Sequence, residues 1–385
     1  MQQITRKDCD MIYVISCALQ NQKPDKERIE TMDLKALYEA ARKHSLTAMV
    51  YMALEDTGVF GAADQAWMRQ WRDEKDKAIR KNILFDTERN QLLALMEKAG
   101  IWYMPLRGSV LKDDYPKYGM RQMSDNDILY DASYAKELQM IMKSRGYKVD
   151  NYGNWYPDVY KKPPVYNFEM HKDLSLVNEC HENYYKNVKS RLLPDEGKKY
   201  GYHFSDEDFY IYMTAHAYKH FCISGTGMRT LVDTYVFLQK KGTLDWEYIR
   251  HELDKLEMSD FERKCRVLSG KIFTEDLLEN PKLLTEKEKR ELCDFLHAGT
   301  YGTMEQFTRN KLREFHPNEE TITFWVKVRY CLSRLFPGRK WCKLYCPFFD
   351  RHPYLLPVFW GYRLVWAVFS QRDRVKAEIG AVRKS

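Results

Sequence analysis

Residues 106–131, LRGSVLKDDYPKYGMRQMSDNDILYD, contain a Gly-Ser turn, a helix-like segment, the pair Asp125 and Asp127, and an apolar run. If residues 125–130 form a strand, Asp125 and Asp127 point to the same face, because side chains alternate with a period of two. Two carboxylates on one face repel each other unless a cation lies between them, and such oxygen ligands suit Mg²⁺. The Gly-Ser turn can present N–H groups and a hydroxyl to phosphate. The stretch therefore predicts a site for a metal ion and a triphosphate.

A third carboxylate follows in YNFEMH, residues 166–171. Apolar side chains at positions 168 and 170 alternate with polar ones, which is the pattern of a half-buried strand. Glu169 lies on the polar face, and on a neighbouring strand it would complete a triad with the two aspartates. A D-x-D pair alone is more often a solvated turn, so the predicted site depends on the Gly-Ser turn and on Glu169.

The order of these motifs resembles polymerase-beta-like nucleotidyltransferases and, more narrowly, a family of uncharacterised bacterial nucleotidyltransferases. The residues that carry the resemblance are Leu106-Arg107-Gly108-Ser109, Leu111, Tyr115-Pro116, Arg121, Asp125, Asp127, Phe168-Glu169-Met170-His171, His216, Lys219, His220, Gly227, Arg229, Val232-Asp233 and Asp245-Trp246. Two positions depart from the family's pattern. Arg107 stands where lysine is usual, which changes the geometry of the charge, and Asn126 replaces an apolar residue between the aspartates.

The resemblance implies an α+β fold: a small mixed β-sheet, the nucleotidyltransferase core, flanked by N-terminal helices and a C-terminal helical domain. It also implies an enzyme dependent on Mg²⁺ or Mn²⁺ that transfers an NMP group from an NTP, with ATP as the first candidate, to an unidentified hydroxyl acceptor. Asp125, Asp127 and Glu169 would be the catalytic, metal-binding residues. The residues expected to bind the nucleotide are Gly108, Ser109, Lys112, Arg121, Lys219, His220 and Arg229.

Several of these side chains also have a purely structural interpretation. Arg121 could form a salt bridge instead of binding phosphate, and Lys112 could be a solvated lysine. Lys219 and Asp233 could belong to a polar network between domains. If Arg229 faces the nucleotide, we expect Asp233, four residues later on the same helix, to pair with it.

The helix expected at residues 206–223 would form a cleft with the sheet, and the active site would lie in that cleft. His216 and His220, four residues apart, could in principle bind zinc. The residue after His216 is Ala217 rather than the glutamate of the protease motif, and the sequence offers no clear third ligand. A zinc hydrolase is therefore discounted.

Periodicity predicts the remaining elements. Helical patterns cover residues 8–22, 33–56, 65–98, 109–118, 134–145, 206–223, 229–240, 246–257, 260–279, 285–298, 303–313 and 319–335. Strand patterns cover residues 101–106, 125–130 and 165–171, with a further strand beginning at 147–149 and a loop or hairpin connection at 151–165. This order predicts a small mixed sheet with helices on one side.

The length of 385 residues favours two or three domains. The boundaries that we expect are an N-terminal helical region at 1–99, the core at 100–180, a helical domain at 181–320 and a basic C-terminal helical region at 321–385. Nine cysteines, an odd number, show no standard zinc spacing and suggest reduced thiols. The N-terminus does not resemble a signal peptide, so we expect a cytoplasmic protein.

The C-terminal region has a distinct charge. Residues 321–385 hold 13 Lys/Arg and 3 Asp/Glu, which gives them a net charge of +10. The whole chain carries +7, so the remaining residues together carry −3. Such a region suggests an anionic partner, namely nucleic acid, lipid head groups or a phosphorylated substrate, or else a solvated helical face. A non-catalytic protein that binds nucleotide or nucleic acid with the same fold is therefore the alternative function.

The most apolar run, PYLLPVFWGYRLVWAVF, occupies residues 353–369. Two prolines and Arg363 interrupt it, and it is too short to span a bilayer comfortably, so no transmembrane segment is expected. It is interpreted either as a core helix or, because basic residues flank it, as a helix lying on a membrane surface.

Overall fold

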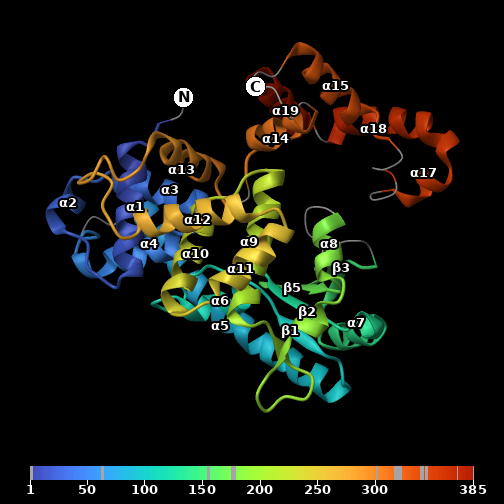
Figure 1. Ribbon diagram of the computed structural model, residues 1–385, viewed down its shortest axis with the longest axis horizontal. Helices are drawn as coiled ribbons and strands as arrows, with labels where there is room; N and C mark the ends of the chain where they lie inside the picture. Colours follow the sequence, from blue (N-terminus) through green and yellow to red (C-terminus); the bar gives the residue numbers. More distant parts are fainter. Residues whose placement is uncertain are drawn as a thin grey trace. The chain divides into compact units, whose positions relative to one another are not determined.

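The computed structural model describes residues 3–61, 65–153, 157–174, 179–300, 302–315, 323–338, 342, 346–370 and 372–384. The chain divides into two compact units. The first unit comprises Met1–Lys219 and Gly227–Thr300, and the second comprises His220–Thr226 and Tyr301–Ser385. Figure 1 colours the chain from blue to red along its length.

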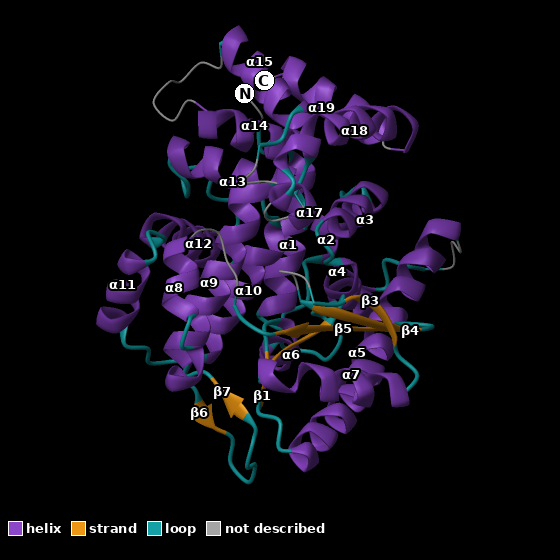
Figure 2. Cartoon of the chain, turned by 90° about the vertical axis from the view of Figure 1, so that its right-hand side faces the viewer, coloured by secondary structure: helices purple, strands orange, loops and turns teal. Residues whose placement is uncertain are grey.

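The first unit contains a mixed five-stranded sheet in the order β1-β2-β5-β4-β3, seen as orange strands in Figure 2. The strands are β1 (Tyr103–Pro105), β2 (Asn126–Tyr130), β3 (Lys148–Asn151), β4 (Asp158–Lys162) and β5 (Tyr166–His171). Only the central pair, β2 and β5, is parallel, and the other pairs are antiparallel. A second sheet pairs β6 (Leu193–Pro194) with β7 (Tyr202–His203). The predicted α+β fold with a small mixed sheet is confirmed.

Helices make up most of the rest of the described chain. Those before the sheet are α1 (Arg6–Leu19), α2 (Lys26–Glu30), α3 (Leu34–Lys43), α4 (Thr47–Leu54), η1 (Glu55–Thr57) and α5 (Ala66–Ala99). Those between and after the strands are α6 (Gly108–Leu111), η2 (Lys112–Asp114), η3 (Ala132–Tyr134), α7 (Ala135–Ser144), α8 (Glu179–Tyr185), η4 (Val188–Arg191), α9 (Asp206–Ile223), α10 (Met228–Lys240), α11 (Trp246–Lys255), α12 (Ser259–Ile272) and α13 (Glu286–Ala298). The second unit contains α14 (Met304–Phe315), α15 (Phe324–Leu335), α17 (Pro347–Arg351), η5 (Pro353–Leu355), α18 (Leu356–Ser370) and α19 (Arg372–Lys384).

Helices α5 and α7 cover one face of the sheet. Leu92 and Met96 of α5 and Leu138 and Met142 of α7 are at most 1% exposed and belong to one hydrophobic cluster. The side chains of the strands in that cluster are Tyr103, Ile128, Tyr130, Tyr160, Phe168 and Met170. Burying each side chain of this kind contributes roughly 1.5–3 kcal/mol. Because side chains alternate along a strand, residues 127, 169 and 171 lie on the opposite face.

Asn126 occupies a position on the α5 face where an apolar residue is usual in the resembled family. The side chain is fully buried, and α5 provides its hydrogen-bond partners. The Arg89 guanidinium donates to Asn126 Oδ1 over 3.2 Å, and Asn126 Nδ2 donates to the Phe85 carbonyl over 3.4 Å. A buried polar group that is paired in this way carries little penalty, so β2 stays a central, buried strand.

Apart from shifts of one to three residues, three predicted helices have different bounds in the part of the chain that the structure describes; residues 319–322 of the helix predicted at 319–335 lie outside it. The pattern at 33–56 breaks between α3 and α4, because Ser45 adopts a positive φ of 54° that a continuous helix does not allow. The pattern at 109–118 forms only α6 and η2 and ends at Asp114. The pattern at 260–279 ends at Ile272.

In the second unit, α14, α15 and α19 share a small core. Leu312, Val326 and Tyr330 are buried together. Glu378 of α19 accepts hydrogen bonds from the Tyr330 hydroxyl and from Arg334 Nε, the latter over 2.7 Å. In the part of the chain that the structure describes, no helix combines the length and the apolar character needed to cross a membrane.

Candidate active site

Strands β2 and β5 bring the predicted carboxylates together. Their parallel register places Asp127 opposite Glu169 and Leu129 opposite His171. Asp127, Glu169 and His171 each offer one ligand atom, and these atoms lie within 4.8 Å of one another. All three side chains are on the face of the sheet that α5 and α7 leave free, so the alternation of the strands builds the cluster.

Asp125, immediately before β2, extends this acidic cluster. Its side chain is hydrogen-bonded to that of Asp127, and burial together with the Asp127 charge raises the pKa of Asp125 to about 6. Burial and the charges of both aspartates also raise the pKa of Glu169. The cluster therefore concentrates negative charge that a bound cation would relieve. The carboxylates of Asp127 and Glu169 and the imidazole of His171 form a donor set of the kind that binds a metal cation.

Arg107 is the positive charge that the chain itself supplies to the cluster. One of its guanidinium nitrogens pairs with Asp127 Oδ1, and the other lies 2.8 Å from His216 Nε2. Burial alone would raise the pKa of Asp127, but the Arg107 charge and a hydrogen bond from His171 hold this pKa below its usual value. Arg107 also has a positive φ of 49° with ψ of −116°. Backbone strain in a non-glycine residue persists only where the surroundings enforce it.

Helix α9 contributes side chains beside the same face of the sheet. The Arg107 guanidinium donates a hydrogen bond to His216 Nε2 over 2.8 Å, so a helix also lies beside the face of the sheet that α5 and α7 leave free. Burial and the nearby Arg107 charge lower the pKa of Lys219, whereas the charges of Asp173 and Glu169 act to raise it. Lys219 thus lies within electrostatic reach of the cluster. The next residue, His220, belongs to the second unit.

Gly108 makes room for the side chain of Arg121. A Cβ atom on Gly108 would lie 2.2 Å from Arg121 Nη1 and 2.9 Å from Met123 Sδ, so a larger residue would displace both. The Arg121 guanidinium donates two hydrogen bonds to Asp233, over 2.9 and 2.8 Å. The Tyr115 hydroxyl donates to the same carboxylate. Arg121 is therefore engaged in a buried structural pair.

Arg229, on α10, acts electrostatically on both this pair and the acidic cluster. It donates to the Gln122 carbonyl, and its charge acts to lower the pKa of both Asp125 and Asp233. The sequence predicts that Asp233 pairs with Arg229. In the structure, Arg121 donates two hydrogen bonds to Asp233, a pairing that the sequence does not predict. Arg229 thus places a positive charge close enough to Asp125 to act on its pKa.

Ser109 and Lys112 point toward α5 instead of the carboxylates. The Ser109 hydroxyl lies 3.5 Å from Asn126 Oδ1, on the α5 side of β2. Lys112 Nζ forms ion pairs with Asp86 of α5, over 2.9 Å, and with Asp113, over 2.5 Å. Both side chains are about 5% exposed. Any contribution of this turn to phosphate binding would therefore come from its backbone.

Three residues at the site were not predicted from the sequence to take part in it: Arg107, His171 and His216. His171 carries a usable signal, because it is two residues after Glu169 on an alternating strand and shares its face. Arg107 was noted only as a departure from the resembled family. His216 was considered only as a zinc ligand, and the sequence does not show that it meets Arg107, 109 residues earlier.

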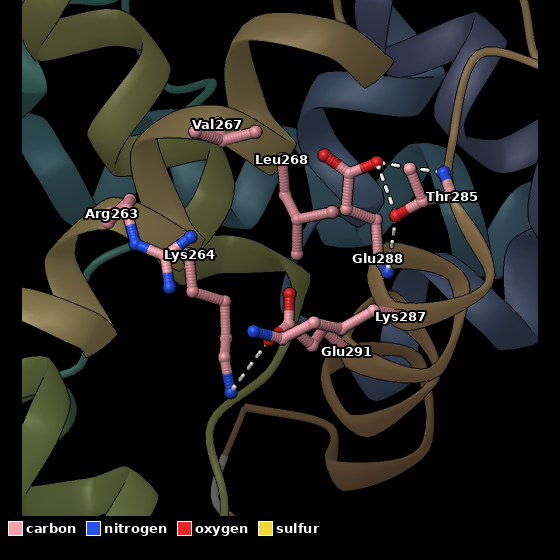
Figure 3. Close-up of a pocket in the computed structure, with 8 residues that line it drawn as sticks. All are labelled: Arg263, Lys264, Val267, Leu268, Thr285, Lys287, Glu288 and Glu291. Atoms are coloured by element: carbon pink, nitrogen blue, oxygen red, sulfur yellow. Dashed lines mark hydrogen bonds and ion pairs between the residues drawn. The ribbon is translucent and has the colours of Figure 1, made fainter.

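A separate hollow lies between α12 and α13 (Figure 3). It has a volume of about 140 Å³ and is lined by Arg263, Lys264, Val267, Leu268, Thr285, Lys287, Glu288 and Glu291. Lys264 pairs with Glu291 over 3.8 Å, and the Thr285 hydroxyl and N–H donate to Glu288. These charges are compensated locally, and none of the acidic cluster lines this hollow.

Comparison with protein families identifies a family for much of the chain. Residues 30–274, well over half of the chain, match the family model described as uncharacterised nucleotidyltransferase. No curated protein and no solved structure matches the chain. The matched range contains the whole five-stranded sheet, the acidic cluster and Arg229. The chain therefore belongs to this family of uncharacterised nucleotidyltransferases.

Proposed function

We propose that the protein is a polymerase-beta-like nucleotidyltransferase that uses Mg²⁺ or Mn²⁺ to transfer an NMP group from an NTP, such as ATP, to a hydroxyl acceptor. The observation that carries the proposal is the convergence of Asp127, Glu169 and His171 to within 4.8 Å on adjacent parallel strands. Asp125 lies beside them, with its pKa raised to about 6 by burial and by Asp127. Carboxylates under this mutual repulsion are suited to share a divalent cation.

Asp127, Glu169 and His171, together with Asp125, would hold the metal. A bound metal would neutralise negative charge on the triphosphate and on the phosphoryl group that is transferred. Glu169, whose pKa is raised by burial and by the two aspartates, would also accept the proton of the attacking hydroxyl.

Lys219 and Arg229 supply positive charge for the nucleotide. Burial and the neighbouring Arg107 disfavour the charged form of Lys219, and the negative charge of a bound polyphosphate would favour that form. Arg229 already interacts electrostatically with Asp125. The backbone N–H of Gly108, where α6 begins, would be offered to the phosphates, whereas the Ser109 N–H donates to the Leu106 carbonyl over 3.2 Å.

The test uses two conservative variants, Asp127→Asn and Glu169→Gln, and a matched control, Asp150→Asn. Asp150 lies on β3 of the same sheet and forms an exposed pair with Lys161. We measure pyrophosphate release and transfer of α-labelled NMP from each NTP with Mg²⁺ or Mn²⁺, using a cell extract as the source of acceptor. Both site variants should lose about a hundredfold or more in rate, and Asp150→Asn should match the wild type.

Full activity of Asp127→Asn and Glu169→Gln would show that the acidic cluster is not the site. If the wild type releases no pyrophosphate from any NTP but binds nucleic acid with affinity that falls steeply as salt rises, the non-catalytic alternative is correct.

A further inference from the structure

One face of helix α18 is apolar along its whole length and exposed. Its members are Val358, Tyr362, Val365, Trp366 and Phe369, which are 70%, 65%, 59%, 47% and 81% exposed. They are separated by four, three, one and three residues, a spacing that places them on one side of a helix. We call these five residues the α18 stripe. A contiguous exposed apolar surface of this kind marks a site of interaction.

The other side of α18 is packed within the second unit. Trp360 Nε1 donates to the Pro337 carbonyl over 3.2 Å, and the Trp360 ring meets the Phe336 ring at 5.4 Å. Phe359 is 6% exposed and stacks on Phe349 at 4.3 Å. The helix is thus anchored on one side, and this packing directs the α18 stripe outward from the second unit.

The composition of the exposed surface suits the boundary between water and lipid. Tyr362 and Trp366 combine an apolar ring with a polar group, as side chains do at membrane interfaces. Helix α15 adds two exposed aromatic side chains, Phe324 at 71% and Trp325 at 75%. A protein partner could also bury such rings, so the charge of the region has to decide between the two.

The charge around α18 is strongly positive. Residues 321–385 carry a net charge of +10, and Arg351, Arg372 and Lys376, on either side of α18, are exposed. This charge complements an anionic surface, to which each nearby Lys or Arg is attracted. It also opposes burial of the stripe against a second copy of the same positively charged region.

The length of α18 favours a position in the plane of the membrane. Its 15 residues span about 22 Å at the helical rise, less than the roughly 30 Å of a bilayer core. We propose that α18 binds the surface of a bilayer that contains anionic lipid. The α18 stripe would enter the boundary between head groups and acyl chains, and the flanking basic side chains would contact the anionic head groups.

The experiment measures co-sedimentation of the full chain with vesicles. Phosphatidylcholine vesicles with and without phosphatidylglycerol form the two arms, each at low and high salt. The variant Val365→Gln/Phe369→Gln removes two members of the α18 stripe without changing charge. The matched control is Met140→Gln, which alters an equally exposed apolar residue on α7, 64% exposed. All variants change solvent-exposed side chains, and thermal unfolding verifies that each is folded.

We expect the wild type and Met140→Gln to bind vesicles with phosphatidylglycerol, and the double variant to bind them about tenfold or more weakly. Binding should weaken at high salt and on pure phosphatidylcholine, because part of it is electrostatic. Equal binding by the double variant would overturn the proposal. Failure of the wild type to bind either kind of vesicle would also overturn it. Sedimentation velocity would then show whether a second copy covers the α18 stripe, because the wild type would be a dimer and the double variant would not.

Discussion

Among single residues, Arg107 is the cationic side chain that pairs directly with the acidic cluster. Asp127 accepts a hydrogen bond from His171 over 2.8 Å and pairs with Arg107. Arg107 also acts on Asp125 and Glu169, but burial and the neighbouring carboxylates outweigh it, and the pKa of each is raised. A divalent cation at the cluster would therefore compete with Arg107 for Asp127.

This competition makes a prediction for Arg107→Met, which keeps much of the side-chain length and removes the charge. Without metal, the variant should lose about 3 kcal/mol in the free energy of unfolding, because a buried carboxylate loses its partner. Adding Mn²⁺ should restore more stability to the variant than to the wild type, since the ion no longer competes with the guanidinium. Urea unfolding with and without Mn²⁺ measures both effects.

Arg107→Lys is the control for that experiment, because it keeps the charge but loses the geometry of the guanidinium. Its metal-dependent gain in stability should lie between those of the wild type and Arg107→Met. An Arg107→Met variant that gains no more from Mn²⁺ than the wild type would contradict the competition.

The sequence could predict some members of the cluster and not others. Glu169 could be matched with the aspartates because a period of two fixes the face of each strand residue. The contact between Arg107 and Asp127 could not, because it depends on a positive φ at residue 107, which the sequence pattern does not indicate. Arg121 could be given two roles from the sequence. The structure shows the salt bridge to Asp233, and phosphate binding by Arg121 stays a prediction.

At the scale of elements, a buried histidine joins three helices of the first unit. His44, at the end of α3, accepts a hydrogen bond at Nδ1 from the N–H of Met228, the first residue of α10. It also hydrogen-bonds to the backbone of Leu296 in α13. The two bonds fix the neutral form, and burial followed by the Lys43 charge lowers the pKa of His44 to about 4.

This junction predicts an acid-sensitive fold. In the unfolded chain the imidazole titrates near about 6.5, so between about pH 6.5 and pH 4 the unfolded state binds a proton that the folded state does not. The free energy of unfolding should therefore fall by up to about 3 kcal/mol as the pH is lowered through this window, and stay level above it. Urea unfolding at several pH values measures the slope.

The variant His44→Asn isolates the effect, because its amide oxygen can replace Nδ1 as an acceptor but does not titrate. It should lose most of the slope between pH 4 and 6.5. The control His203→Asn, at an exposed histidine paired with Asp195, should keep it. A His44→Asn variant with the slope of the wild type would show that another group controls acid stability.

Long elements with a clear period could be predicted from the sequence, and short ones could not. The 34 residues of α5 were expected almost to the residue, because their apolar stripe is long and Gly100 ends the helix in a left-handed conformation. The break between α3 and α4 was not predicted, because the apolar residues before and after positions 44 and 45 keep a helical spacing. Helix α2, with five residues, is too short to show a period.

At the scale of the whole molecule, α9 contributes to both units. His216 and Lys219 belong to the first unit, whereas His220–Thr226 belong to the second. Within the second unit, Asn310 Nδ2 donates to the carbonyls of Phe221 and Cys222 over 2.9 and 3.0 Å. The end of α9 thus depends on the C-terminal part of the chain, because the last carbonyls of a helix need partners from outside it.

The last prediction concerns a chain that ends at residue 300 and lacks α14 to α19. The sheet, the acidic cluster and its Arg107 partner all belong to the first unit, so Mn²⁺ binding, measured by titration, should match that of the full chain. The free energy of unfolding should fall by about 1–3 kcal/mol, because the carbonyls at the end of α9 lose their donors. Asn310→Ala in the full chain should reproduce the part of this loss that comes from Phe221 and Cys222. Loss of Mn²⁺ binding by the shortened chain, with the first unit still folded by circular dichroism, would show that the cluster requires the second unit.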